Sequence, residues 1–230
     1  MEPPFALAPL VRGFLDQTLT AAQWTHQAHM AVGAWLVHQH GPEDALPQLR
    51  HGIRRLNVAL GGVNSDTRGY HETITAAYAT LLGDFFDRYA DGLKPDAAVA
   101  RVLASPLTTR DALLRFYSRP CLDSIEARRR WVEPDLAPLR ASALYGGTFT
   151  ARLFRYPGKG GWTFAPVPDG CTPPVTHGWG RTPVQAEVDG HAWDTSVWRG
   201  KDGRTLLAVP LAVRGLKGDG DSVLVRLLFD

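Results

Sequence analysis

The residues best suited to do chemistry are histidines gathered in the first third of the chain. Six of the eight histidines lie before residue 72. His26 and His29 are three residues apart in the segment WTHQAH, so a helix would place both imidazoles on one face. His71 and Glu72 follow a glycine-containing loop, at the expected start of another helix. Three imidazoles and one carboxylate form a usual ligand set for Zn, Fe, Ni or Mn.

This pattern predicts one divalent metal ion held by His26, His29 and His71, with one coordination position open to water. A bound metal ion would lower the pKa of that water, and Glu72 would serve as a fourth ligand or as the general base. The chemistry indicated is that of a metal-dependent hydrolase or oxygenase acting on a small molecule.

Four further residues are predicted to contact the substrate. Arg54 and Arg55 would meet an anionic group, and Asn64 lies in the loop 61–69 expected to line the entrance. Tyr78 falls on the same helical segment as His71 and would supply a hydroxyl group. These residues complete the predicted site in the N-terminal half.

The sequence leaves two other interpretations of the same residues open. Histidines on a helix face often satisfy a buried polar contact, and a carboxylate in the first helical turn interacts favourably with the helix dipole. The residues would then form a metal-free polar pocket, or would have only structural roles. The alternative function is a non-catalytic module that binds a ligand or a protein. Catalysis by a serine nucleophile is less well supported than metal-dependent catalysis, because no Gly-x-Ser-x-Gly motif is present.

The elements that must position these side chains change character near residue 140. Before it, apolar residues recur at helical spacing, and we expect helices at about 21–38, 46–60 and 70–89. After the proline-containing segment 133–138 the apolar spacing becomes two, as in Val184, Ala186 and Val188. Asp-Gly pairs at 189–190 and 202–203 indicate hairpin turns. We therefore expect an α+β chain of two domains, an α-helical bundle over 1–140 and a small antiparallel β-barrel over 141–230.

The C-terminal segment also resembles a known family. The stretches ARLFRYPGKGGW (151–162), GWGRTPVQAEVDGHAW (178–193) and GDSVLVRLLF (220–229) carry the resemblance. They are similar to a bacterial small double-split β-barrel family, known only as a domain of unknown function. The resemblance implies a barrel over the last 80 residues or so and implies no activity. The N-terminal half is similar only in layout to three-histidine metal-binding helical bundles of the DNA-damage-inducible type.

Composition limits the remaining possibilities. Of the 230 residues, 44% are hydrophobic and 21% are charged, which is typical of a globular chain. The net charge is only +2 and no basic stripe stands out, so we expect no nucleic-acid partner. The longest apolar run, 31–37, is too short for a membrane span. Two cysteines far apart in sequence and no apparent secretory signal indicate a cytoplasmic protein. Free strand edges make a homodimer plausible.

Overall fold

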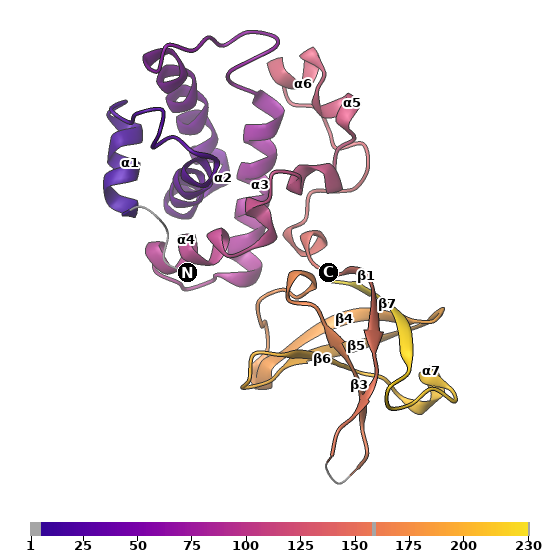
Figure 1. Ribbon diagram of the computed structural model, residues 1–230. Coiled ribbons are helices and arrows are strands. Elements are labelled where there is room, and N and C mark those ends of the chain that lie inside the picture. Colours follow the sequence, from indigo (N-terminus) through magenta and orange to yellow (C-terminus); the bar gives the residue numbers. More distant parts are fainter. Residues whose placement is uncertain (1–5, 158–159, 230) are drawn as a thin grey trace. The chain divides into compact units, whose positions relative to one another are not determined.

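The chain folds into two compact units, residues 1–144 and 145–230. The computed structural model describes residues 6–157 and 160–229. The first unit is helical and the second is an antiparallel β-barrel (Figure 1), which confirms the predicted fold class. The division falls four residues after the expected boundary at 140, because the short turn Ala141–Leu144 packs with the helices.

The helical unit is built around two long helices that lie side by side. Its α-helices are α1 (Leu7–Leu15), α2 (His26–Ala59), α3 (Glu72–Tyr89), α4 (Pro95–Leu103), α5 (Arg119–Leu122) and α6 (Ile125–Arg129). Short 3₁₀ turns at Pro106–Thr108, Ala112–Arg115 and Ala141–Leu144 complete it. Helix α2 packs against α1, α3 and α4. Within residues 6–157 and 160–229, no helix is both long and apolar enough to span a bilayer.

Local sequence explains where the two long helices begin and bend. The Thr25 hydroxyl accepts a hydrogen bond from the Ala28 amide at 3.2 Å and caps α2. Helix α2 bends at Gly41, where φ is 77°, and Pro42 opens its second half. A left-handed residue followed by proline cannot continue a regular helix, so the glycine-proline pair separates two helical runs.

The barrel consists of a single seven-stranded antiparallel sheet that nearly closes on itself. Its strands are β1 (Gly147–Arg152), β2 (Phe154–Arg155), β3 (Thr163–Val167), β4 (Arg181–Val188), β5 (His191–Arg199), β6 (Thr205–Ala208) and β7 (Ser222–Leu228). The order across the sheet is β1-β7-β4-β5-β6-β3-β2. A short helix, α7 (Leu211–Arg214), precedes β7.

Strand alternation and turn chemistry place the barrel core as the sequence predicts. Along β4, Val184, Ala186 and Val188 are buried while their neighbours Gln185 and Arg181 face outward. The β4–β5 hairpin turns at Asp189 and Gly190, whose φ angles are 48° and 88°. Two positive φ angles in succession define the turn type that Asp-Gly favours between twisted antiparallel strands.

Candidate functional site

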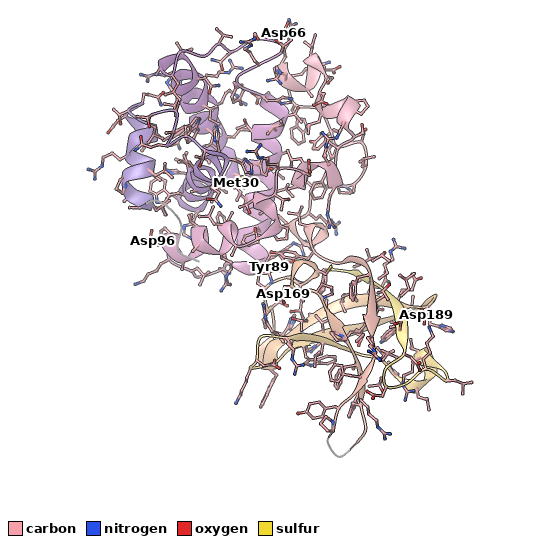
Figure 2. All side chains as sticks on the ribbon, in the orientation of Figure 1. Met30, Asp66, Tyr89, Asp96, Asp169 and Asp189 are labelled. Carbon is pink, nitrogen blue, oxygen red and sulfur yellow. The ribbon has the colours of Figure 1, made fainter. Side chains whose placement is uncertain are left out.

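A cavity of about 490 Å³ opens in the helical unit between α2, α3 and the segment 110–123. Its walls are mostly aliphatic, and Met30, labelled in Figure 2, comes from α2. The aliphatic and small lining residues are Met30, Gly33, Leu49, Ile53, Ile74, Ala79, Leu82, Leu113, Leu114 and Leu122. Cavities of this size and polarity are typical of small-molecule sites. Gly33 contributes no side chain, which leaves space between the two long helices.

Two of the predicted histidines line this cavity from the first turns of α2. The His26 Nε2 lies 3.0 Å from the Thr108 carbonyl oxygen, and the His29 Nδ1 lies 2.8 Å from the Thr25 carbonyl oxygen. Because a carbonyl only accepts, Nδ1 of His29 carries the proton and Nε2 is the lone-pair nitrogen of the neutral ring. Burial lowers the pKa of His29 below 6.5, so the ring is neutral near pH 7.

Helix α3 adds two polar side chains to the cavity. Tyr78 lines it, and burial, reinforced by the nearby Asp111, raises the pKa of Tyr78 to about 12. The phenol is therefore a neutral hydrogen-bond donor at physiological pH rather than an acid or base. Thr75 also lines the cavity, while its hydroxyl donates to the His71 carbonyl oxygen at 2.9 Å.

Charged residues surround the cavity on the side formed by the segment 110–123. Arg110, Asp111, Arg119 and Asp123 line it and are exposed. Arg119 and Asp111 form an ion pair of 3.4 Å with side chains that are 69% and 75% exposed. Exposed pairs contribute little to stability, so this bridge can open without a large cost. The arrangement joins an apolar interior to a rim that carries both signs of charge.

His71 does not join the other two histidines. Its Nε2 lies 2.9 Å from the Leu122 carbonyl oxygen, and its Nδ1 accepts a hydrogen bond from the Ile74 amide at 3.3 Å. Both ring nitrogens are therefore occupied by backbone groups, which leaves no lone pair for a metal ion. His71 is the N-cap of α3 and ties that helix to α5.

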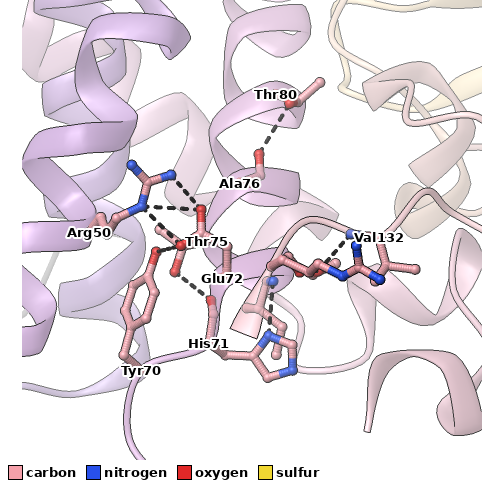
Figure 3. A network of polar contacts seen from close by, with 11 residues as sticks. Arg50, Tyr70, His71, Glu72, Thr75, Ala76, Thr80 and Val132 are labelled. Carbon is pink, nitrogen blue, oxygen red and sulfur yellow. Dashed lines mark hydrogen bonds and ion pairs between the residues drawn. The ribbon is translucent and has the colours of Figure 1, made fainter. Parts of the chain in front are cut away.

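Glu72 is likewise held by protein groups, as Figure 3 shows. Its carboxylate accepts hydrogen bonds from Arg50 Nε at 2.9 and 3.2 Å, from Arg50 Nη2 at 2.5 Å, and from the Tyr70 hydroxyl at 3.0 Å. Burial alone would raise the pKa of Glu72, but the bonds from Arg50 and Tyr70 outweigh it and lower the pKa below 4.5. A carboxylate with such a pKa and no free oxygen is not a general base poised near neutral pH.

Three of the predicted substrate-binding residues, Arg54, Arg55 and Asn64, do not line the cavity. The Arg54 guanidinium lies 4.6 Å from the centre of the Tyr70 ring. Asn64 donates to the Arg54 carbonyl oxygen and accepts from the Tyr70 amide, and Arg55 lies 3.5 Å from His51. The same loop contains Asp66, which Figure 2 shows far from Met30. The loop 61–69 therefore does not line the cavity.

These contacts correct the geometry of the predicted metal centre. His26 and His29 share the cavity, but His71 and Glu72 face other partners. Among the residues that the structure describes, no group of three or more His, Cys, Asp or Glu side chains is arranged to hold a metal ion. The structure does not bring the four residues together, because His71 and Glu72 bond to Leu122 and Arg50, which are distant in the chain.

Several lining residues carry no signal in the sequence. Arg110, Asp111, Arg119 and Asp123 come from short turns and from the start of α5; the sequence predicts short helices at about 109–117 and 122–132 but does not mark these charged residues as part of a cavity. Ile53 follows the helical spacing of apolar residues in α2, which predicts an ordinary core residue. Only the aliphatic face of α3, with Ile74 and Leu82, could have indicated a surface shared with α2.

Comparison with known proteins bears on the barrel alone. A family model described as "Domain of unknown function (DUF1905)" matches residues 149–227. The match runs from β1 into β7 and includes no part of the helical unit. It supports the C-terminal resemblance. No curated protein matches the chain.

Proposed function

We propose that this protein is a ligand-binding module whose helical unit holds a small, largely apolar molecule in the cavity between α2 and α3. The observation that carries the proposal is the cavity itself, about 490 Å³ in volume and walled mainly by aliphatic side chains. Burying the apolar part of a ligand there supplies the main driving force.

A few polar groups would orient the ligand. The neutral His29 ring offers an acceptor nitrogen, and Tyr78 offers a hydroxyl group. Polar groups in a mostly apolar pocket determine specificity, because a ligand that leaves them unpaired loses affinity. The ligand class that fits is a hydrophobic molecule with one small polar end.

The metal-dependent hydrolase or oxygenase indicated by the sequence is the weaker of the two candidates. It requires His71 and Glu72 to leave their partners Leu122 and Arg50. The ligand-binding module needs no such rearrangement. A cytoplasmic location, a bacterial source and a homodimer remain predictions from the sequence.

The proposal is tested with the environment-sensitive dye anilinonaphthalene sulfonate, which is apolar with one anionic group. We expect the full-length protein to enhance its fluorescence at one saturable site, and decanoate to displace it. Gly33→Leu fills the cavity from α2, and Leu114→Trp fills it from the segment 110–123. Both variants should abolish the saturable signal.

Val58→Trp is the matched control, because Val58 is 61% exposed on α2 and lies outside the cavity. It should bind the dye as the unsubstituted protein does. Far-UV circular dichroism verifies that each variant is folded. Saturable dye binding that decanoate still displaces in both filled variants would refute the cavity as the ligand site.

A further inference from the structure

One side of the barrel carries aromatic side chains on its outer surface. Strands β5, β6, β3 and β2 are consecutive neighbours in the sheet. Their inward positions hold buried residues such as Ala165 and Leu207. The outward positions of these strands and their ends hold Phe154, Tyr156, Trp162, Phe164, Trp198 and Leu206. We refer to these six residues as the aromatic face.

Four of the six side chains of the aromatic face form a cluster centred on Phe164. Phe164 lies opposite Phe154 in register, with ring centroids 5.9 Å apart. The rings of Tyr156 and Trp162 lie 6.3 and 6.5 Å from that of Phe164. On the other side, Trp198 lies opposite Leu206 in register. The four clustered rings form a platform rather than scattered single side chains, and Trp198 lies two strands away on β5.

This platform is open to water. Trp162 is 60% exposed, Tyr156 is 56% exposed and Trp198 is 37% exposed. By contrast, the outward positions of β1 and its neighbour β7 include Thr148 and Arg226, which lie opposite each other in register. The outward positions of β7 also hold Leu224 and Leu228, 53% and 45% exposed, so this second side is mixed polar and aliphatic and the aromatic rings lie on the other side. Contiguous exposed apolar surface of this kind commonly marks a binding site.

Trp179 extends the platform at the start of β4. It is 99% exposed, and its φ of 65° is a left-handed value that bulky residues seldom adopt. Its neighbour Gly180 packs so closely on β5 that a Cβ would lie 2.2 Å from the Arg199 carbonyl oxygen. This close contact fixes the backbone at Gly180 beside the end of β5 that carries Trp198, and core packing does not explain the exposed Trp179 indole.

Cationic side chains lie close to one end of the aromatic face. At the other end, Arg155 alternates with Phe154 and Tyr156 along the strand, so its side chain leaves the opposite face, and its backbone amide donates to the Asp219 carboxylate at 2.9 Å. Arg181 lies directly opposite Trp198 in register and donates to the Ser196 hydroxyl at 2.9 Å.

The turn after Trp198 adds further positive charge. It contains Arg199, Lys201 and Arg204, and its one carboxylate, Asp202, is paired with Arg204 at 2.6 Å. The acidic Glu187 lies at the opposite end of the β4–β5 hairpin. Positive charge is thus concentrated at the end of the aromatic face that carries Trp198.

We propose that the aromatic face binds single-stranded nucleic acid. Exposed aromatic rings stack on bases without strict sequence preference, and flanking arginines contact phosphates. The overall charge of +2 led the sequence analysis to expect no such partner. The folded barrel nonetheless places Arg181 and the basic turn 199–204 next to Trp198, and a whole-chain sum cannot reveal such a local cluster. This site is independent of the cavity in the helical unit.

The test measures fluorescence anisotropy of a fluorescein-labelled oligothymidylate of about 15 nucleotides titrated with the full-length protein. We expect saturable binding that weakens between about 50 and 200 mM salt, because phosphate contacts release counterions. Trp162→Ala and Trp198→Ala should each weaken binding by about five-fold or more, and Trp198→Phe should restore most of it. Leu224→Ala, on the outer surface of β7, is the control and should leave affinity unchanged.

Three results would overturn the proposal. The first is an anisotropy that stays flat at low salt, and the second is binding that both tryptophan variants leave unchanged. The third is a dimer, seen by light scattering, that both alanine variants dissociate while the oligonucleotide does not bind. That last result would show that a second copy of the chain covers the aromatic face. Circular dichroism melting confirms that each variant remains folded.

Discussion

Replacing Glu72 by glutamine distinguishes a structural role from a catalytic one. The side chains of Glu72 and Arg50 are 10% and 39% exposed, so the pair is intermediate between a buried and a surface ion pair. Breaking a buried pair costs about 3–5 kcal/mol, whereas a surface pair is worth about 0–1 kcal/mol. Arg50 can regain water, but the Tyr70 hydroxyl loses a charged acceptor. We therefore expect Glu72→Gln to lower the free energy of unfolding by about 2 kcal/mol.

Urea unfolding followed by far-UV circular dichroism measures this loss, because the helical unit dominates the signal. Glu126→Gln is the matched control. Glu126 pairs with Arg130 on the surface, with side chains 57% and 73% exposed, and its loss should cost less than about 0.5 kcal/mol. A double-mutant cycle with Arg50→Gln should give a coupling energy of about 1 kcal/mol or more.

The pH dependence provides the sharper test. The folded-state pKa of Glu72 is lowered, so its carboxylate stabilises the fold above the unfolded pKa near 4.5. This stabilisation is lost as the pH falls through the folded value. The difference between the unsubstituted protein and Glu72→Gln should therefore stay constant at neutral pH and shrink only below about 4.5. A difference that shrinks between pH ~6 and ~7, where a general base titrates, would refute the structural assignment.

Two further predictions concern packing and metal content. A Cβ on Gly52 would lie 2.3 Å from Phe14 Cζ, so Gly52→Ala should destabilise the protein by about 1–3 kcal/mol in urea unfolding. Gly33→Ala, whose Cβ would meet nothing nearer than 3.6 Å, should instead stabilise the protein by about 0.5–1 kcal/mol. If both substitutions changed the free energy of unfolding equally, the tight contact between Gly52 and Phe14 would be contradicted. His71→Ala should lower stability by about 1–3 kcal/mol while elemental mass spectrometry finds the metal content unchanged. Stoichiometric metal that disappears with His71 would restore the three-histidine centre.

The sequence alone determined the elements whose causes are local. Helical spacing before residue 140 and alternation after it predict the two kinds of structure, because each pattern places apolar side chains on one face of its own element. Gly41-Pro42 and Asp189-Gly190 mark a bend and a hairpin, since backbone conformation there depends on the residues themselves. His26 and His29 share one surface because one helix carries both.

The tertiary structure alone decided which groups form hydrogen bonds with the candidate site residues. His71 bonds to Leu122, 51 residues away, and Glu72 bonds to Arg50, 22 residues away. Spacing along the chain carries no information on which distant carbonyl or guanidinium will satisfy a side chain. The cavity wall from Arg110 to Asp123 and the aromatic face of the barrel arise in the same way. Both are surfaces assembled from segments that meet only when the chain folds.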